Sequence, residues 1–240
     1  MQNPNGPYPG RQLFLGLTKE NKPAFAYLVT GRSPQSRERR ATIKENSIIM
    51  GPIGNVPYDP LRHYTAVKYD SNIGLMAVSN GIQTEAIFET YRLLYNVKST
   101  PDNSYLKKIM DGANYEADNL KTPRIGGLIT NNDDSNTPVF IVSIKTAGKP
   151  AFVWSVKPKP GTYYGVSTYH GKMEKPGAFR AAKGPAKIQF SAVTSHEIAD
   201  YIYEISAASN QGDDIRVCTI GGVRGTNNTW KIALVNRHKG

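Results

Sequence analysis

Cysteine is almost absent from this sequence: its 240 residues contain one, Cys218. A single cysteine excludes an intrachain disulfide and argues against a secreted disulfide scaffold. The surrounding residues Ile215–Ile220 are rich in β-branched side chains and predict a strand. We therefore expect the thiol to be a small buried hydrophobic group and not a nucleophile.

Long hydrophobic runs are also missing. The run Ile73–Val78 has the length of a strand, and the first 30 residues carry prolines and basic residues where a signal peptide would have an apolar core. The sequence thus predicts a soluble, cytoplasmic protein without a membrane partner. We expect one domain over residues 1–240, with residues 1–7 as a flexible polar extension.

The usual catalytic motifs do not occur. The four histidines are isolated from one another and from Cys218, so no zinc-ligand spacing exists. There is no Gly-x-Ser-x-Gly elbow and no Walker loop, and Gln2 excludes a terminal nucleophile after initiator removal. Gly221–Gly225 has too few glycines for a dinucleotide fingerprint, and we expect a turn there between the last two strands. We predict no cofactor and no metal.

Charge is the most unbalanced part of the composition. Lysine and arginine number 30 against 19 acidic residues, a net charge of +11. The basic residues are spread along the chain, and the densest cluster lacks the interleaved aromatic residues of a single-strand binding surface; it comprises Arg32, Arg37, Arg39, Arg40 and Lys44. A small anionic ligand or a solvated basic face explains this charge as well as nucleic acid does.

Strands and helices are expected in separate blocks. Hydrophobic periodicity predicts helices at 82–96 and 103–112, the first with a stripe of Ile82, Ala86, Ile87, Thr90, Leu93 and Leu94. Thr194–Glu197 is a capping box, and Ile198, Ile202 and Ile205 follow on one helix face. Strands are predicted at 11–17, 23–31, 42–50, 64–69, 72–79, 124–130, 138–145, 150–157, 161–169, 214–221 and 229–236.

This order lacks regular strand–helix alternation and therefore favours an α+β fold with largely antiparallel sheets. The loops at 32–40, 114–123 and 170–187 are polar and long enough to carry function.

Two segments have side chains suited to anions or carbonyl groups. Gly31–Arg37 follows a strand and offers two arginines and two serines, although a solvated turn has the same composition. Val78–Gly81 joins a strand to a helix, where free N–H groups favour an anion or a carbonyl oxygen. Ser79 or Asn80 could equally be the helix cap.

A third segment, Asn114–Arg124, combines two carboxylates with two cations. Glu116 and Asp118 lie close in sequence to Lys121 and Arg124, and Pro123 restricts the backbone before the next strand. Exposed salt bridges would explain the composition as well as a binding site would. Taken alone, this segment does not decide between structure and function.

Together the segments resemble a known family, the archaeal-type IMP cyclohydrolases. The matching stretches keep their order over residues 8–170, with weaker similarity in the closing strands; they are Tyr8–Arg11, Arg32–Ser33 with Arg37, Pro57–Tyr58, Ser79–Gly81 with Thr84, Tyr115–Glu116 with Asp118, Thr122–Ile125 and Ser167–Tyr169. The chain departs from the family at its longer loops around 96–104 and 170–187 and at its N-terminal extension.

The resemblance implies a fold and a reaction. The fold is the four-layered αββα sandwich of the N-terminal-nucleophile hydrolases, here without the terminal nucleophile. The reaction closes a formamido-imidazole-carboxamide ribotide to inosine monophosphate with loss of water. Because the attacking nitrogen belongs to the substrate, no Ser–His pair or metal is needed. A homo-oligomer, and by resemblance a tetramer, is expected.

Site residues follow from the same resemblance. Glu116 is expected to transfer the proton, with Tyr58 as its partner or as an oxyanion donor. Arg32 is the third catalytic candidate and would bind the carboxamide, the formyl oxygen or the phosphate. The remaining candidates would bind the substrate: Ser33 and Arg37 at the phosphate, Asn80, Gly81 and Arg124 at the carboxamide, the formyl oxygen or the phosphate, and Asp118, Thr122 and Tyr169 at the ribose or in support.

Three alternatives remain below this hypothesis. A nucleotide-binding protein of the same fold would keep the pocket without the chemistry. An amide hydrolase acting on another substrate would need an activated water or nucleophile, and none is evident in the sequence. A nucleic-acid binder would lose affinity steeply with salt. We expect a small-molecule ribotide as the partner and no nucleic acid.

Overall fold

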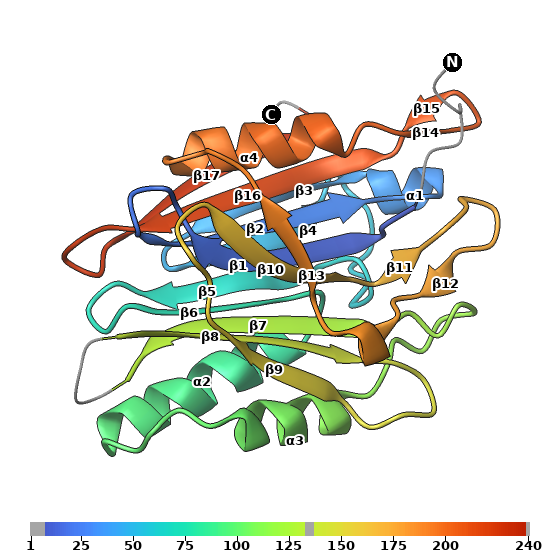
Figure 1. Cartoon of the computed structure of the whole chain (residues 1–240). Helices are drawn as coiled ribbons and strands as arrows, with labels where there is room; N and C mark the ends of the chain where they lie inside the picture. The colour runs from blue at the N-terminus through green and yellow to red at the C-terminus, as the bar shows by residue number, and fades with distance from the viewer. Residues whose placement is uncertain (1–7, 133–136, 239–240) are drawn as a thin grey trace.

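Two antiparallel sheets face each other in this protein (Figure 1). The structure is a computed structural model and describes residues 8–132 and 137–238. The six-stranded sheet has the order β13-β10-β1-β2-β16-β17, formed by Ala186–Gln189, Thr162–Ser167, Arg11–Leu17, Pro23–Thr30, Arg216–Arg224 and Trp230–Asn236. The seven-stranded sheet runs from β3 to β9 in chain order, through Arg39–Lys44, Ser47–Pro52, Tyr64–Asp70, Leu75–Ser79, Arg124–Asn131, Pro138–Lys145 and Phe152–Val156.

The longer helices cover the outer faces of these sheets (Figure 1). Helices α2 (Gln83–Asn96) and α3 (Asn103–Ala113) pack on the seven-stranded sheet, and α4 (Ser195–Ile205) packs on the six-stranded sheet. The inner faces share one apolar core, to which Leu13 and Phe25 contribute from one sheet and Val78 and Ile129 from the other. The predicted α+β class with largely antiparallel sheets is confirmed.

Short elements fill the connections. They are α1 (Pro34–Arg37), η1 (Ala181–Lys183) and two small hairpins, β11–β12 (Tyr169–His170 with Gly177–Ala178) and β14–β15 (Ser209–Asn210 with Asp213–Asp214). Within residues 8–132 and 137–238, no helix is long and apolar enough to cross a bilayer. The predicted extension at residues 1–7 lies outside the described residues.

The helices form where the sequence predicts them, but their buried faces are partly different. Helix α2 buries Thr84, Ile87, Phe88, Tyr91 and Leu94, whereas the predicted stripe members Ile82 and Leu93 are each 61% exposed. The stripe was correct at Ile87 and Leu94, but it omitted Phe88 and Tyr91, which are buried with them in the same apolar cluster. The capping box at Thr194 and Glu197 is confirmed, and of the predicted apolar face Ile205 is exposed at the helix end.

One predicted strand is a hairpin. The segment 42–50 divides into β3 and β4, which pair as neighbours through a tight turn between Lys44 and Ser47. Glu45 takes a left-handed conformation there, with φ of 52°. Strand β3 therefore begins at Arg39, inside the predicted loop 32–40, and forms one edge of the seven-stranded sheet.

The glycines of Gly221–Gly225 serve packing and not only a turn. Residues 221–224 lie inside β16, and the turn comes afterwards, at Gly225–Thr229. A Cβ atom on Gly221 would lie 2.2 Å from the backbone oxygen of Ser195, so glycine allows α4 to approach the strand. Cys218, on the same strand, is fully buried as predicted, and burial raises its pKa to about 12.

Candidate active site

A polar cavity of about 540 Å³ opens at one end of the facing sheets. Its wall combines the first residue of β1, the last of β2, the α1 loop, the first residue of β3 and the loops 59–62 and 116–122. The lining residues are Tyr8, Arg11, Thr30, Arg32, Ser33, Gln35, Ser36, Arg39, Asp59, Leu61, Arg62, Glu116, Asp118, Leu120, Thr122 and Tyr169. Segments far apart in the sequence thus meet at one sheet end.

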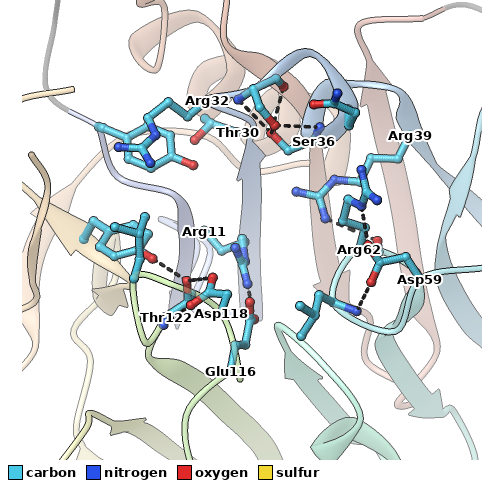
Figure 2. A pocket seen from close by; sticks show the side chains of 16 residues that line it. Arg11, Thr30, Arg32, Ser36, Arg39, Asp59, Arg62, Glu116, Asp118 and Thr122 are labelled. Atoms are coloured by element: carbon cyan, nitrogen blue, oxygen red, sulfur yellow. Dashed lines mark hydrogen bonds and ion pairs between the residues drawn. The ribbon is translucent and has the colours of Figure 1, made fainter. Parts of the chain in front are cut away.

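The Glu116 carboxylate lies on the cavity wall next to Arg11 (Figure 2). The side chain is 2% exposed, and its Oε1 atom accepts hydrogen bonds from three residues. Arg11 Nη2 donates from β1, Asn80 Nδ2 donates at 3.1 Å, and Arg124 Nη1 donates at 3.2 Å. These donors fix the carboxylate against the cavity wall, with two cations beside it.

Burial and the carboxylate act in opposite directions on the two arginines. Burial lowers the pKa of Arg11, but Glu116, Tyr64 and Tyr27 together raise it by more, and the net pKa lies well above the ordinary arginine value. For Arg124, burial is the larger influence and lowers the pKa despite the nearby Glu116. Arginine remains protonated in proteins. The cluster therefore places two positive charges against one carboxylate.

Asn80 holds this cluster together from the connection between β6 and α2. Its Oδ1 accepts from the backbone N–H of Ile125 at 2.8 Å, and its Nδ2 donates to the backbone oxygen of Pro123 at 2.9 Å. It is not the helix cap: α2 begins after Ile82, which makes no side-chain capping bond. Asn80 therefore links the start of β7 to Glu116.

Gly81 gives Arg124 the room to reach Glu116. A Cβ atom at Gly81 would lie 2.0 Å from Arg124 Nη1, closer than atoms of a folded protein can approach. The same Nη1 donates to the backbone oxygen of Asn80 at 3.2 Å. Any larger residue at position 81 must displace the guanidinium.

Hydroxyl groups line the floor beside Glu116. Asp118 accepts from the backbone N–H of Thr122 at 2.8 Å and from its hydroxyl, and that hydroxyl also contacts the Tyr169 hydroxyl. Tyr8 stacks on Tyr169 with ring centroids 5.6 Å apart. Burial raises the pKa of Tyr169 to about 12, so its hydroxyl keeps its proton at neutral pH.

The opposite wall is basic (Figure 2). Arg39 is 2% exposed, and its Nη1 donates to the backbone oxygen of Arg62 at 3.2 Å, while its Nε has no hydrogen-bond partner. Arg62 itself pairs with Asp59 at 2.6 Å. Arg32 donates to the backbone oxygen of Met173 at 3.3 Å, which brings the loop 170–187 to the cavity. This wall is suited to a phosphate group.

The predicted residues fall into three groups. Arg32, Ser33, Glu116, Asp118, Thr122 and Tyr169 line the cavity. Asn80, Gly81 and Arg124 lie directly behind Glu116. Tyr58 and Arg37 stand outside the lining.

Those two outer residues have different surroundings. Tyr58 is 71% exposed, with its ring 5.8 Å from that of His63, although its neighbour Asp59 lines the cavity. Arg37 is buried and donates to Asp213 at 2.6 Å and to the backbone oxygen of Arg32 at 3.1 Å. Arg37 therefore supports the loop that carries Arg32.

Sequence reasoning missed several lining residues, above all Arg11, Arg39 and Arg62. Arg11 had a usable signal, since it begins an otherwise apolar strand. Arg39 and Arg40 are adjacent in β3, where alternation buries the first and exposes the second, and only the strand register decides which. No group of three or more potential metal ligands occurs among the described residues.

Comparison with known proteins adds an independent observation. The sequence model of the family described as IMP cyclohydrolase-like protein matches residues 8–228. The chain is 31% identical to the IMP cyclohydrolase of Methanocaldococcus jannaschii over 81% of this chain and 85% of that protein. It is 26% identical to the Methanosphaera stadtmanae IMP cyclohydrolase over 82% and 85%, and 30% identical to a Methanococcus maripaludis one over 52% and 60%.

Proposed function

The chain belongs to the IMP cyclohydrolase-like family, and from this membership we propose that it closes a formamido-imidazole-carboxamide ribotide to inosine monophosphate. One observation carries the proposal: the buried Glu116 faces a cavity whose opposite wall is formed by Arg32, Arg39 and Arg62. A volume of about 540 Å³ is within the range of sites for small molecules of this size.

The reaction defines what the protein must supply. The carboxamide nitrogen attacks the formyl carbon and loses one proton. The formamido nitrogen then loses its own proton as its double bond to that carbon forms, and the former formyl oxygen leaves as water. The site must hold the two arms of the substrate together, which is the entropic part of the barrier. It must also stabilise the negative charge that develops on oxygen and transfer a proton.

We assign proton transfer to Glu116 and stabilisation of the developing charge to Arg11. The carboxylate lines the cavity while Arg11, Asn80 and Arg124 hold its Oε1 atom. Arg11 also lines the cavity, so its guanidinium can contact both Glu116 and the substrate. In this assignment Asn80 and Arg124 position the carboxylate.

The substrate phosphate is assigned to the basic wall. Arg32 and Ser33 offer donors from the α1 loop, and Arg39 provides a buried cation next to them. Arg37 acts through its contact with the Arg32 backbone. At the other end, Asp118, Thr122 and Tyr169 form a hydrogen-bonded group suited to the ribose hydroxyls.

An ultraviolet assay tests the function directly, because ring closure to a purine changes the absorption spectrum. Purified protein mixed with the formylated ribotide is expected to produce inosine monophosphate. If inosine monophosphate raises the melting temperature and the ribotide is never consumed, the chain is a binding protein without the chemistry. Turnover of other amides without the ribotide would identify a hydrolase.

The predicted role of Tyr58 needs its own test. Since the side chain is 71% exposed and outside the lining, we expect Tyr58→Phe to keep turnover within a few-fold of the parent. A loss of about 10²-fold or more would restore Tyr58 to proton transfer.

Further features of the protein are proposed alongside this function. The order of helix, sheet, sheet and helix supports a relation to the N-terminal-nucleophile hydrolase fold (Figure 1). The apolar core shared by both sheets supports one domain. A homo-oligomer, a cytoplasmic location and the absence of a nucleic-acid partner stay predictions, and sedimentation of the purified protein tests the first.

A further inference from the structure

A second cavity lies at the opposite end of the same two sheets. Strand β1 runs from Arg11, in the catalytic cavity, to Leu17, which lines the second cavity. Seven residues of strand span about 20 Å, so the two sites are separate. The volume of the second cavity is about 590 Å³, similar to that of the catalytic cavity.

Arg224, the last residue of β16, is the unusual member of this lining. The side chain is 5% exposed, and its Nη1 donates to the backbone oxygen of Gly74 at 2.9 Å. Within the described chain, no aspartate or glutamate lies within ion-pair distance of its guanidinium. Burial lowers the pKa of Arg224 to about 10, which reflects the cost of holding this cation away from water.

The other buried arginines show what such a cation normally requires. Arg11 and Arg124 pair with Glu116, and Arg37 pairs with Asp213. Arg39 faces the catalytic cavity, where the proposed substrate carries a phosphate. Arg224 is the remaining buried arginine of the described residues, and it too faces a cavity. Among the residues that the structure describes, none supplies an anionic group beside it.

The rest of the lining describes the ligand more closely. Lys157 provides a second, exposed cation, and Asn21, Asn132 and Ser155 offer hydrogen bonds. Most of the remaining wall is apolar and includes Leu17, Pro23, Pro138, Val139, Phe140, Val156 and Pro158. Inorganic anions would leave this apolar surface uncovered, whereas an anion with an apolar body would cover it.

We propose that this cavity is a second binding site, for a small organic anion whose carboxylate or phosphate pairs with Arg224 and whose apolar body lies against Phe140 and Val156. The sequence predicts a turn at Gly221–Gly225 and no role for Arg224. The structure places its guanidinium in a cavity because β16 extends to residue 224.

Titration calorimetry with phenyl phosphate and benzoate tests the site, with benzyl alcohol as the neutral match. Both anions are expected to bind the parent more tightly than benzyl alcohol does. Arg224→Gln should weaken anion binding by about tenfold or more, and Arg224→Lys by less, because it keeps the charge. Equal binding of all three compounds by the parent would overturn the proposal.

Arg32→Gln separates the two cavities, since Arg32 lines only the catalytic one. It should leave benzoate binding unchanged. If Arg32→Gln abolishes binding and Arg224→Gln preserves it, the anions occupy the catalytic cavity and the proposal fails.

A surface pair covers the case in which Arg224→Gln does not fold. Lys157→Glu reverses an exposed charge at the cavity and should weaken both anions several-fold, while Lys159→Glu, exposed two residues further and outside the lining, should not. Equal effects of the two substitutions would show a general charge effect and overturn the site.

Discussion

Replacing Glu116 by glutamine is expected to lower both the free energy of unfolding and the turnover rate, each for a different reason. The substitution keeps the shape and one acceptor oxygen but removes the negative charge that lies between Arg11 and Arg124. Arg11 and Arg124 are 7% and 5% exposed, so water does not replace the lost carboxylate. The folded state must then hold two uncompensated cations.

The magnitude follows from this burial. Removing one partner of a buried ion pair costs about 3–5 kcal/mol, and the retained acceptor oxygen places the expected loss near the lower end, at about 3 kcal/mol. For a chain of this size each kcal/mol lowers the melting temperature by about 2–4 °C, so we expect a fall of about 6–12 °C. Loss of a proton-transfer group should reduce turnover by about 10²–10⁴-fold.

Two assays separate the effects. Urea unfolding measures stability, and the ultraviolet assay measures turnover at a temperature where parent and variant are both folded. Asp214→Asn is the control, because it breaks the ion pair with Arg216 at 2.7 Å outside the cavity lining. It should lower stability and leave turnover per folded molecule unchanged. Parental turnover in Glu116→Gln would refute the assigned role, and parental stability would refute the buried charge cluster.

Three further substitutions test the cavity. Gly81→Ala should push Arg124 away from Glu116. We expect the free energy of unfolding to fall by about 1–3 kcal/mol and turnover to decrease, as urea unfolding and the ultraviolet assay would show. Unchanged values would mean that Arg124 does not need this space. Arg32→Gln should raise KM by roughly tenfold with a smaller change in kcat, and a pure kcat effect would contradict substrate binding. Tyr169 has a pKa raised by burial to about 12, above the unfolded value, so its contribution to stability is complete below about pH 10 and is lost as pH rises through 12. The free energy of unfolding, measured from about pH 8 to 11, should therefore fall less steeply with pH in Tyr169→Phe than in the parent. Parallel pH dependences of the two proteins would count against a buried Tyr169.

Local signals in the sequence predicted the elements well. Strand β1 has the predicted bounds 11–17, and the Thr194–Glu197 capping box starts α4 as expected. Both depend on residues a few positions apart, so the pattern itself contains the interaction. The failure at 42–50 has the same origin, because a two-residue turn inside a run of β-forming residues leaves little trace.

The site was predicted in part, since the ordered set of motifs identified Glu116 and the loops around it. The motifs did not show that Asn80 binds the start of β7 and does not cap α2. They also did not show that Arg37 pairs with Asp213, so that Arg39 and not Arg37 lines the cavity. Each of these contacts joins residues that are distant in sequence. Their side chains are chemically equivalent to many others until the strands are in register.

Composition, periodicity and motif order by themselves determined the α+β class and the family resemblance, and they made Glu116 a candidate. Only the tertiary structure decided which basic residues surround that carboxylate, because the contact between Arg11 and Glu116 spans 105 positions of sequence. It also decided that Arg224 faces a second cavity. Sheet register and the facing of two sheets set both results, and neither is encoded in any short stretch of the chain.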